Sequence, residues 1–158
     1  LMANSHIGHD CRVGDNVIMV NCSAAAGHVE IGDRAIISGL AGIHQFTRIG
    51  KFAMISGGGM VNQDIIPYVT AQGDRARPVT LNLVGMKRNG YTREQIKAVK
   101  HVFKTLFFRG LLLKDAVAQL RAENLPPEAS LILDFIESSK RGIARPRRNA
   151  SMAETAAD

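Results

Sequence analysis

The chain has 158 residues, of which 46% are hydrophobic, and it carries a net charge of +6 at neutral pH and two cysteines. This length allows one ordinary domain or two small ones but excludes a large multidomain enzyme. The two cysteines lack the C-x-x-C spacing of a zinc knuckle and are too few for a disulfide framework, so we expect reduced thiols.

Hydropathy and charge favour a cytoplasmic protein. No stretch reaches the roughly 18 to 20 apolar residues that span a bilayer, and no segment of secretory type opens the chain, so we expect no membrane insertion. The chain begins at Leu1 and runs straight into patterned sequence, which indicates the C-terminal part of a longer protein. Basic chains attract polyanions, but neither stacking aromatics nor a recognition helix accompanies the charge, so we expect no nucleic-acid partner.

An aliphatic residue recurs at every sixth position through the first part of the chain. The series is Ile7, Val13, Met19, Ala25, Ile31, Ile37, Ile43, Ile49, Ile55 and Val61. A second series, four positions after the first, is mostly small or β-branched and runs from Cys11 to Ile65. A period of six fits neither a helix nor the irregular strand spacing of an antiparallel sandwich, but it is typical of hexapeptide repeats.

Hexapeptide repeats predict a triangular prism made of stacked coils. Three hexads make one coil, in which each aliphatic residue points into the prism and each small one fits near a corner. Residues one coil apart lie above one another at roughly the 4.8 Å strand spacing. Glycine follows the aliphatic residue in four hexads and is expected to let the chain turn there, at Gly8, Gly14, Gly32 and Gly50. We predict a parallel β-helix over residues 1–67, left-handed because such hexads resemble the known left-handed family.

After Pro67 the repeat stops and a helical pattern begins, which predicts a small C-terminal α-helical domain over residues 68–141. Thr92 and Gln95 form a capping box, and apolar residues follow at three- and four-residue steps until Gly110. The expected helices cover residues 79–89, 92–110, 114–123 and 128–140. Residues 142–158 are basic, then Ala-rich and acidic, and we expect a disordered tail there.

Four of the five histidines gather on one stretch of the predicted prism. They take positions 6, 9, 10 and 8 of the 18-residue coil and are His6, His9, His28 and His44. His9, Gly27 and Gln45 share one position and should form a vertical column. This clustering indicates a functional site.

Two chemistries fit the histidine cluster. A metal-dependent hydratase of the γ-carbonic anhydrase type needs three imidazoles that converge at roughly 2.1 Å from one ion, which a trimer can arrange. Acid/base catalysis needs one histidine, a carboxylate that orients it and a donor for a developing oxyanion. His9 offers the base, Asp10 the carboxylate, and Gly27 a backbone N–H with no side chain in the way. The acid/base interpretation uses more of the observed residues and needs no metal.

Five segments give the sequence a specific resemblance. They are Asn4-Ser5-His6-Ile7-Gly8-His9-Asp10, Ala26-Gly27-His28-Val29, Ile43-His44-Gln45-Phe46, Pro67-Tyr68-Val69 with Ala71-Gln72-Gly73, and Gly85-Met86-Lys87-Arg88. In this order they resemble the UDP-N-acetylglucosamine acyltransferases. The resemblance implies a cytoplasmic homotrimer with active sites between subunits and no cofactor. It also implies transfer of an R-3-hydroxyacyl group from acyl carrier protein to the 3-hydroxyl of UDP-N-acetylglucosamine, the first step of lipid A biosynthesis.

The same resemblance implies a role for each site residue. His9 is the general base, Asp10 supports it, and Gly27 supplies the oxyanion N–H. Gly57 lines the floor of the acyl groove, where glycine leaves room for a longer hydroxyacyl chain. The residues expected to hold the sugar, the diphosphate, the acyl hydroxyl or the nucleotide are His6, His28, His44, Gln45, Asn82 and Arg88.

Two alternative functions stay open at this point. The hydratase predicts bound zinc and loss of activity with a chelator. An inactive trimerisation fragment predicts that replacing His9 changes nothing measurable, and it is a real alternative because the earlier coils of the family, with a lysine and an aspartate of the substrate site, are not in this chain.

Overall fold

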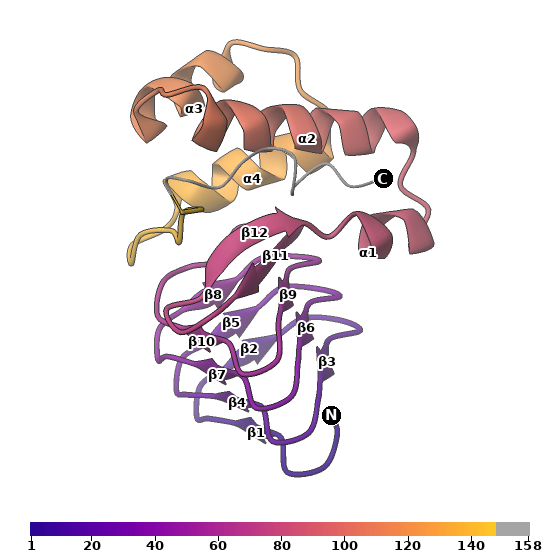
Figure 1. Ribbon diagram of the computed structural model, residues 1–158, viewed down its shortest axis with the longest axis vertical. Helices are drawn as coiled ribbons and strands as arrows, with labels where there is room; N and C mark the ends of the chain where they lie inside the picture. The colour runs from indigo at the N-terminus through magenta and orange to yellow at the C-terminus, as the bar shows by residue number, and fades with distance from the viewer. Residues whose placement is uncertain (148–158) are drawn as a thin grey trace.

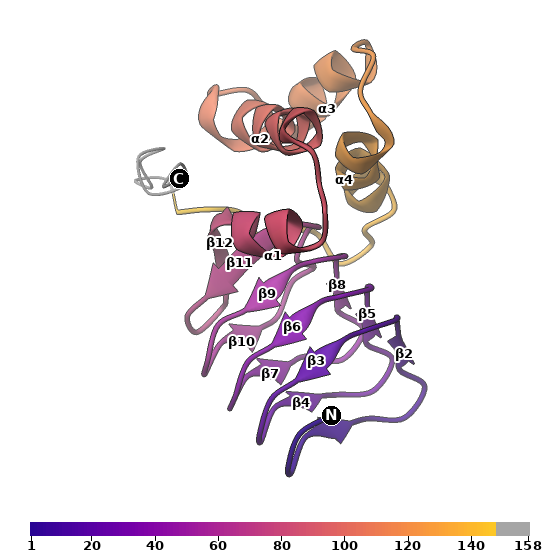
Figure 2. The ribbon, with the colours of Figure 1, turned by 90° about the vertical axis from the view of Figure 1, so that its right-hand side faces the viewer.

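The computed structural model describes residues 1–147, and its first part is a triangular prism (Figure 1). Ten two-residue strands line the prism: β1 His6–Ile7, β2 Arg12–Val13, β3 Ile18–Met19, β4 Ala24–Ala25, β5 Glu30–Ile31, β6 Ile36–Ile37, β7 Gly42–Ile43, β8 Arg48–Ile49, β9 Met54–Ile55 and β10 Met60–Val61. The strands form an A face (β1-β4-β7-β10), a B face (β2-β5-β8) and a C face, to which β11 and β12 are added (β12-β11-β9-β6-β3). Figure 2 shows the coils stacked below the helices.

The coils have the predicted length and phase. Pairing is parallel and joins each residue to the one eighteen positions later, as His6 pairs with Ala24 and Ala24 with Gly42. From Met19 onward every member of the aliphatic series is buried, and so is every member of the small series from Ser23 onward. Burying a large aliphatic side chain contributes about 1.5–3 kcal/mol, so the repeat supplies the core of the prism.

The chain turns at a different residue from the one that we predicted. Ten corner residues, each three positions after or before an aliphatic one, have φ between 56° and 68°: Asn4, Asp10, Asn16, Cys22, His28, Arg34, Leu40, Phe46, Phe52 and Gly58. The glycines after the aliphatic residues have no positive φ. A Cβ at Gly8 would lie 2.7 Å from the carbonyl carbon of Ala26, and one at Gly32 would lie 2.7 Å from the Lys51 nitrogen. These glycines therefore let successive coils approach closely.

A short antiparallel pair covers the last coil before the helices begin. Strand β11 (Val69–Gln72) pairs with β9 in parallel, and β12 (Arg77–Leu81) returns antiparallel to β11. The helix expected over residues 79–89 therefore starts only at Leu83, as α1 (Leu83–Arg88). The physical reason is that residues 77–81 use their backbone groups in the β12 ladder, and the Asn82 side chain caps the helix that follows.

Three more helices form a cap above the prism: α2 (Arg93–Phe108), α3 (Leu113–Arg121) and α4 (Pro127–Glu137). The predicted capping box is present, since the Thr92 side chain accepts from the Gln95 N–H and the Gln95 side chain accepts from the Thr92 N–H. Buried apolar faces pack α2 against both α3 and α4. Over residues 1–147, no helix is long and apolar enough to cross a membrane.

The segment after α4 folds back onto the last coil. Asp64, which is buried, accepts a hydrogen bond from the Ala144 N–H (2.9 Å) and donates from its own N–H to the Gly142 carbonyl (3.0 Å). Ile143 and Ala144 are buried beside it. The expected disorder is therefore wrong for residues 142–147, because this segment pairs with the edge of the prism; residues 148–158 of the expected tail lie outside the described part of the chain.

Two glycine substitutions test the close approach of the coils. Gly32→Ala places a methyl group against the backbone of the next coil and should lower the free energy of unfolding by about 1–3 kcal/mol. Gly57→Ala is the matched control, because its Cβ meets only the Gly39 carbonyl oxygen at an ordinary 3.5 Å. Its effect should stay within about 0.5 kcal/mol. Urea unfolding followed by circular dichroism measures both, and equal effects would contradict this role for Gly32.

Candidate active site

The A–B edge of the prism carries the residues singled out by the sequence. This edge consists of the turns between β1 and β2, β4 and β5, and β7 and β8 (Figure 2). The coils are locked there by backbone hydrogen bonds, from the His28 N–H to the His9 carbonyl (2.9 Å) and from the Phe46 N–H to the Gly27 carbonyl (3.1 Å). The stacking places Gly27 one coil above His9, as the column of the sequence predicts.

His9, Asp10 and His28 form one polar group at this edge. Nδ1 of His9 lies 2.8 Å from Oδ2 of Asp10, and Nε2 of His28 lies 3.7 Å from the same oxygen. The two imidazole rings meet edge to face, with centroids 5.0 Å apart. The side chains of His9 and Asp10 are 75% and 66% exposed, so a ligand can reach them directly.

The electrostatics of the pair decide which nitrogen of His9 is free. The hydrogen bond from His9 is the main reason that the pKa of Asp10 lies below its usual 3.8, and the positive charge of His28 lowers it further against a smaller effect of desolvation. Asp10 is thus an ionised acceptor at neutral pH, and His9 must carry its proton on Nδ1 to bond it. The lone pair then resides on Nε2, where a general base needs it.

Gly27 lies directly against the ring of His9. A Cβ at this position would meet Nε2 of His9 at 2.6 Å, so any side chain would displace the imidazole. Among the residues that the structure describes, the Gly27 N–H has no hydrogen-bond acceptor. Gly27 therefore leaves room for the ring of His9, and its N–H is a candidate donor for an oxyanion.

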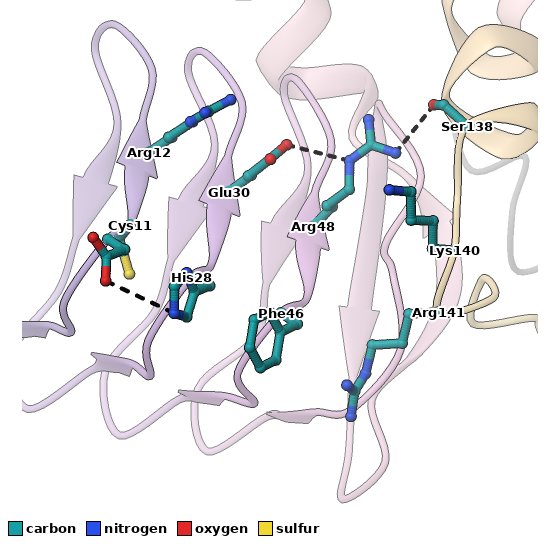
Figure 3. A pocket seen from close by; sticks show the side chains of 10 residues that line it. Cys11, Arg12, His28, Glu30, Phe46, Arg48, Ser138, Lys140 and Arg141 are labelled. Carbon is teal, nitrogen blue, oxygen red and sulfur yellow. Dashed lines mark hydrogen bonds and ion pairs between the residues drawn. The ribbon is translucent and has the colours of Figure 1, made fainter.

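A cleft runs from this group across the B face to the end of α4 (Figure 3). Arg48 stands in the middle of it, with Nε 3.4 Å from a Glu30 carboxylate oxygen and Nη1 3.1 Å from the Ser138 hydroxyl. Lys140 and Arg141 reach the cleft from the segment after α4. The rim is therefore mostly cationic and suits an anionic ligand.

Sequence reasoning missed Phe46, which stacks on His28 with ring centroids 4.7 Å apart and planes 7° from parallel. Asp10, His28 and Phe46 occupy the same position in three successive coils, so the 18-residue repeat contained the signal. Phe46 belongs to one of the segments that carry the family resemblance, but the sequence alone gave it no role. Its ring packs the imidazole of His28 from one side and holds it near Asp10.

The four histidines divide into two pairs along this stretch of the prism. His6 and His44 line a hollow over the A face, where Ala24 and Gly42 leave the sheet bare. The Nδ1 atom of His44 lies 2.9 Å from a guanidinium nitrogen of Arg141 and 3.1 Å from the Gln45 carbonyl oxygen. One pair thus lines the hollow and the other forms the polar group with Asp10, because neighbouring positions in a coil point in different directions.

The expected nucleotide residues lie at another edge. The B–C edge, formed by turns between the B and C faces, carries Phe52, whose carbonyl oxygen accepts a hydrogen bond from the Asn82 side chain (2.9 Å). The Asn82 oxygen also caps α1 by accepting from the Gly85 N–H. Asn82 is buried by these contacts, whereas Arg88 is exposed at the end of α1. Within one chain, α1 therefore lies at a different edge from His9, which belongs to the turn between β1 and β2.

Gly57 lies at the third edge, between the C and A faces, in the turn from β9 to β10. It is exposed, and its immediate neighbour beyond the adjacent residues is the Gly39 carbonyl oxygen of the coil below. Space is therefore open at this position for an apolar ligand or for a neighbouring subunit.

A cation is the other ligand that the edge group can accept. Ligand atoms of His9, Asp10 and His28 all lie within 4.8 Å of one another. This set holds two imidazoles and a carboxylate rather than the three imidazoles that the hydratase interpretation needs. Cation binding would also compete with the hydrogen bond between His9 and Asp10.

The stacked hexapeptide coils and their helical cap place the chain among the left-handed parallel β-helix proteins. Residues 64–144, about half of the chain, match the family described as Udp N-acetylglucosamine O-acyltransferase, domain 2. The chain belongs to this family.

Individual relatives agree with this assignment. The acyl-[acyl-carrier-protein]–UDP-N-acetylglucosamine O-acyltransferase of Burkholderia orbicola is 44% identical over 92% of this chain and 57% of that protein, and the enzyme of a Janthinobacterium species is 45% identical over the same shares. The solved UDP-N-acetylglucosamine acyltransferase of Francisella novicida superposes with a TM-score of 0.87 at 38% identity, over 96% of this chain and 56% of that one. The chain thus spans just over half the length of the curated relatives that it matches.

The pKa of Asp10 tests the His9–Asp10 hydrogen bond. His9→Ala should raise this pKa towards its usual value, and His28→Ala should raise it less, because the hydrogen bond is the larger cause of the shift. Since folding lowers the pKa, the interaction stabilises the folded chain above pH about 4 and is lost as the pH falls through the lowered pKa. Carboxyl carbon shifts in an NMR titration measure it, and a pKa that ignores both substitutions would contradict the pairing.

Proposed function

We propose that the chain carries the catalytic part of an acyltransferase that moves an R-3-hydroxyacyl group from acyl carrier protein to the 3-hydroxyl of UDP-N-acetylglucosamine. This reaction is the first step of lipid A biosynthesis, and we place it in the cytoplasm. The observation that carries the proposal is the His9–Asp10 pair, with Gly27 directly against the ring of His9. The names of the related proteins agree with it.

In the proposed mechanism, Nε2 of His9 takes the proton of the sugar 3-hydroxyl as the oxygen attacks the thioester carbonyl carbon. Asp10 holds the imidazole in the required tautomer and stabilises the imidazolium that forms. The carbonyl oxygen gains negative charge and accepts from the Gly27 N–H. The carbon–sulfur bond then breaks, and His9 returns the proton to the leaving thiol of the carrier protein.

The outer surfaces of the three faces support a homotrimer. The outward residues of the B face are charged: Arg12, Glu30 and Arg48. Those of the C face are apolar and those of the A face are small or apolar beyond His6: Ile18, Ile36 and Met54, and Ala24, Gly42 and Met60. In a cyclic trimer the A face of one subunit would pack against the C face of the next. The charged B face would then remain exposed to solvent.

This packing would assemble a complete site from two subunits. At the outer end of the interface, the A–B edge with His9 meets the neighbour's B–C edge, which carries α1 and Arg88. Arg88 can donate two hydrogen bonds to a phosphate of the nucleotide, and Asn82 fixes the start of the helix that carries it. At the inner end, the groove between the A and C faces reaches Gly57, where the acyl chain would end.

The remaining site residues line the path between these two ends. His28 and Gln45 stand at the A–B edge near the sugar, and His6 and His44 stand in the hollow over the A face, beside the start of the acyl chain. The cationic rim of the cleft on the B face provides complementary charge for an acidic carrier protein.

An acyl-transfer assay tests the proposal. The chain alone and the chain joined to the preceding coils of the Burkholderia orbicola relative receive R-3-hydroxyacyl carrier protein and UDP-N-acetylglucosamine. His9→Ala should lower kcat by about 10²–10⁴-fold while the trimer persists, and donors longer than ten carbons should react because of the space at Gly57.

Other outcomes of this assay would point elsewhere. Equal rates for wild type and His9→Ala would remove His9 from the mechanism. Transfer of only a ten-carbon chain would contradict the role of Gly57. Absence of any product, together with bound zinc and a chelator-sensitive hydratase activity, would favour the metal enzyme.

Mixed trimers test the shared site. His9→Ala and Arg88→Ala chains should each be inactive alone, but co-expression pairs an intact His9 with a neighbour's intact Arg88 at about one quarter of the interfaces by random mixing. Activity should recover to a similar fraction of wild type. A matched mixture of His9→Ala with the double variant His9→Ala/Arg88→Ala should stay inactive, and lack of recovery in the first mixture would place both residues in the same subunit's site.

A further inference from the structure

The segment after α4 brings one side chain onto a histidine of the A face. We call residues 138–145 the strap. It is fixed by the buried Asp64, whose carboxylate accepts from the Ser139 hydroxyl (2.7 Å) and from the Arg48 N–H (2.9 Å). The backbone of Asp64 bonds Gly142 and Ala144 as well. Side-chain and backbone hydrogen bonds therefore both hold the strap against the last coil.

Arg141 extends from the strap to His44, although 97 residues separate them in the chain. Its Nε donates to the Asn62 carbonyl (2.7 Å), which fixes the plane of the guanidinium. Its Nη2 lies 2.9 Å from Nδ1 of His44. Arg141 thus bonds at once to the backbone of the last coil, at Asn62, and to the ring of His44 in the hollow over the A face.

This contact determines the protonation of the His44 ring. A guanidinium has only donors, so Nδ1 of His44 must offer its lone pair at 2.9 Å. The Gln45 carbonyl oxygen, 3.1 Å from the same nitrogen, would instead require a proton on Nδ1. Both demands cannot be met, and an N–H facing an N–H at 2.9 Å is the more unfavourable arrangement. The neutral ring then carries its proton on Nε2.

We propose that Arg141 is a positioning residue that holds His44 in the Nε2–H tautomer, so that His44 acts as a hydrogen-bond donor and not as a base. His9, by contrast, carries its proton on Nδ1 because Asp10 accepts it. The two histidines thus have opposite tautomers set by opposite partners, an arginine and a carboxylate. That the Nε2–H of His44 contacts an oxygen of the acyl donor or the sugar rests on the proposed function, whereas the tautomer does not.

NMR of the chain labelled with ¹⁵N-histidine tests the tautomer directly. Two-bond ¹H–¹⁵N spectra at pH 8.5 should show a protonated Nε2 and an unprotonated Nδ1 for His44, with the opposite pattern for His9. Arg141→Met should shift the His44 signals toward the Nδ1–H tautomer, because the Gln45 carbonyl then becomes the available partner. A protonated Nδ1 in the wild type, or identical His44 signals in both proteins, would overturn the proposal.

Controls separate tautomer from folding and from function. Arg145→Met removes the same charge from the strap, but Arg145 lines a hollow between α3 and α4 and should leave His44 unchanged. Arg141→Lys keeps a donor and should retain more of the Nε2–H form than Arg141→Met. In the transfer assay, Arg141→Met should lower kcat/KM by about tenfold. If the assay gives no product while the tautomer still shifts, the proposed function fails and the role of Arg141 stands.

Discussion

The constant length of the coils is the constraint on which the site depends. Each coil hydrogen-bonds to the next through pairs such as His28 N–H to His9 carbonyl, and these bonds form because the strands of successive coils pair in register with a repeat of eighteen residues. The left-handed φ of Asp10 and His28 belongs to the same repeat, since the chain must turn there. An inserted residue between the two would move His28 out of line with Asp10 and Gly27 away from His9. The geometry of the candidate site is thus set by backbone stacking rather than by local loop structure.

The helical cap protects the upper end of this stack and completes the site. Strands β11 and β12 cover the last coil, and Tyr68 is buried between the prism and the helices, where burial raises its pKa. The cap also returns the chain to the prism, because Asp64 anchors the strap that carries Arg141. The contacts between the strap and Asp64 cover the exposed edge of the last coil. They also place the guanidinium of Arg141 beside His44.

The three faces of the prism differ in the side chains that they present. The B face is charged and bears the cleft, whereas the A and C faces offer small or apolar residues that suit contact with another subunit. The edges between the faces carry most of the candidate site residues, because corner positions point outward and tolerate polar side chains. His9, α1 and Gly57 lie on three different edges of the prism. This arrangement is the one expected if the proposed site forms between two copies of the chain.

The sequence by itself determined the prism, its 18-residue coil, the column of His9 and Gly27, and the capped helix α2, because each is written as a short-range period or motif. The prediction that the chain turns at the glycines after the aliphatic residues was wrong, because these glycines instead allow close contact with the next coil. The predicted start of α1 and the predicted disorder of residues 142–147 were also wrong. Only the tertiary structure showed that His6 and His44 line a hollow over the A face and that Arg141 reaches His44. The physical reason is that face direction and contacts across 97 residues depend on how the coils and the cap pack, which no local pattern encodes.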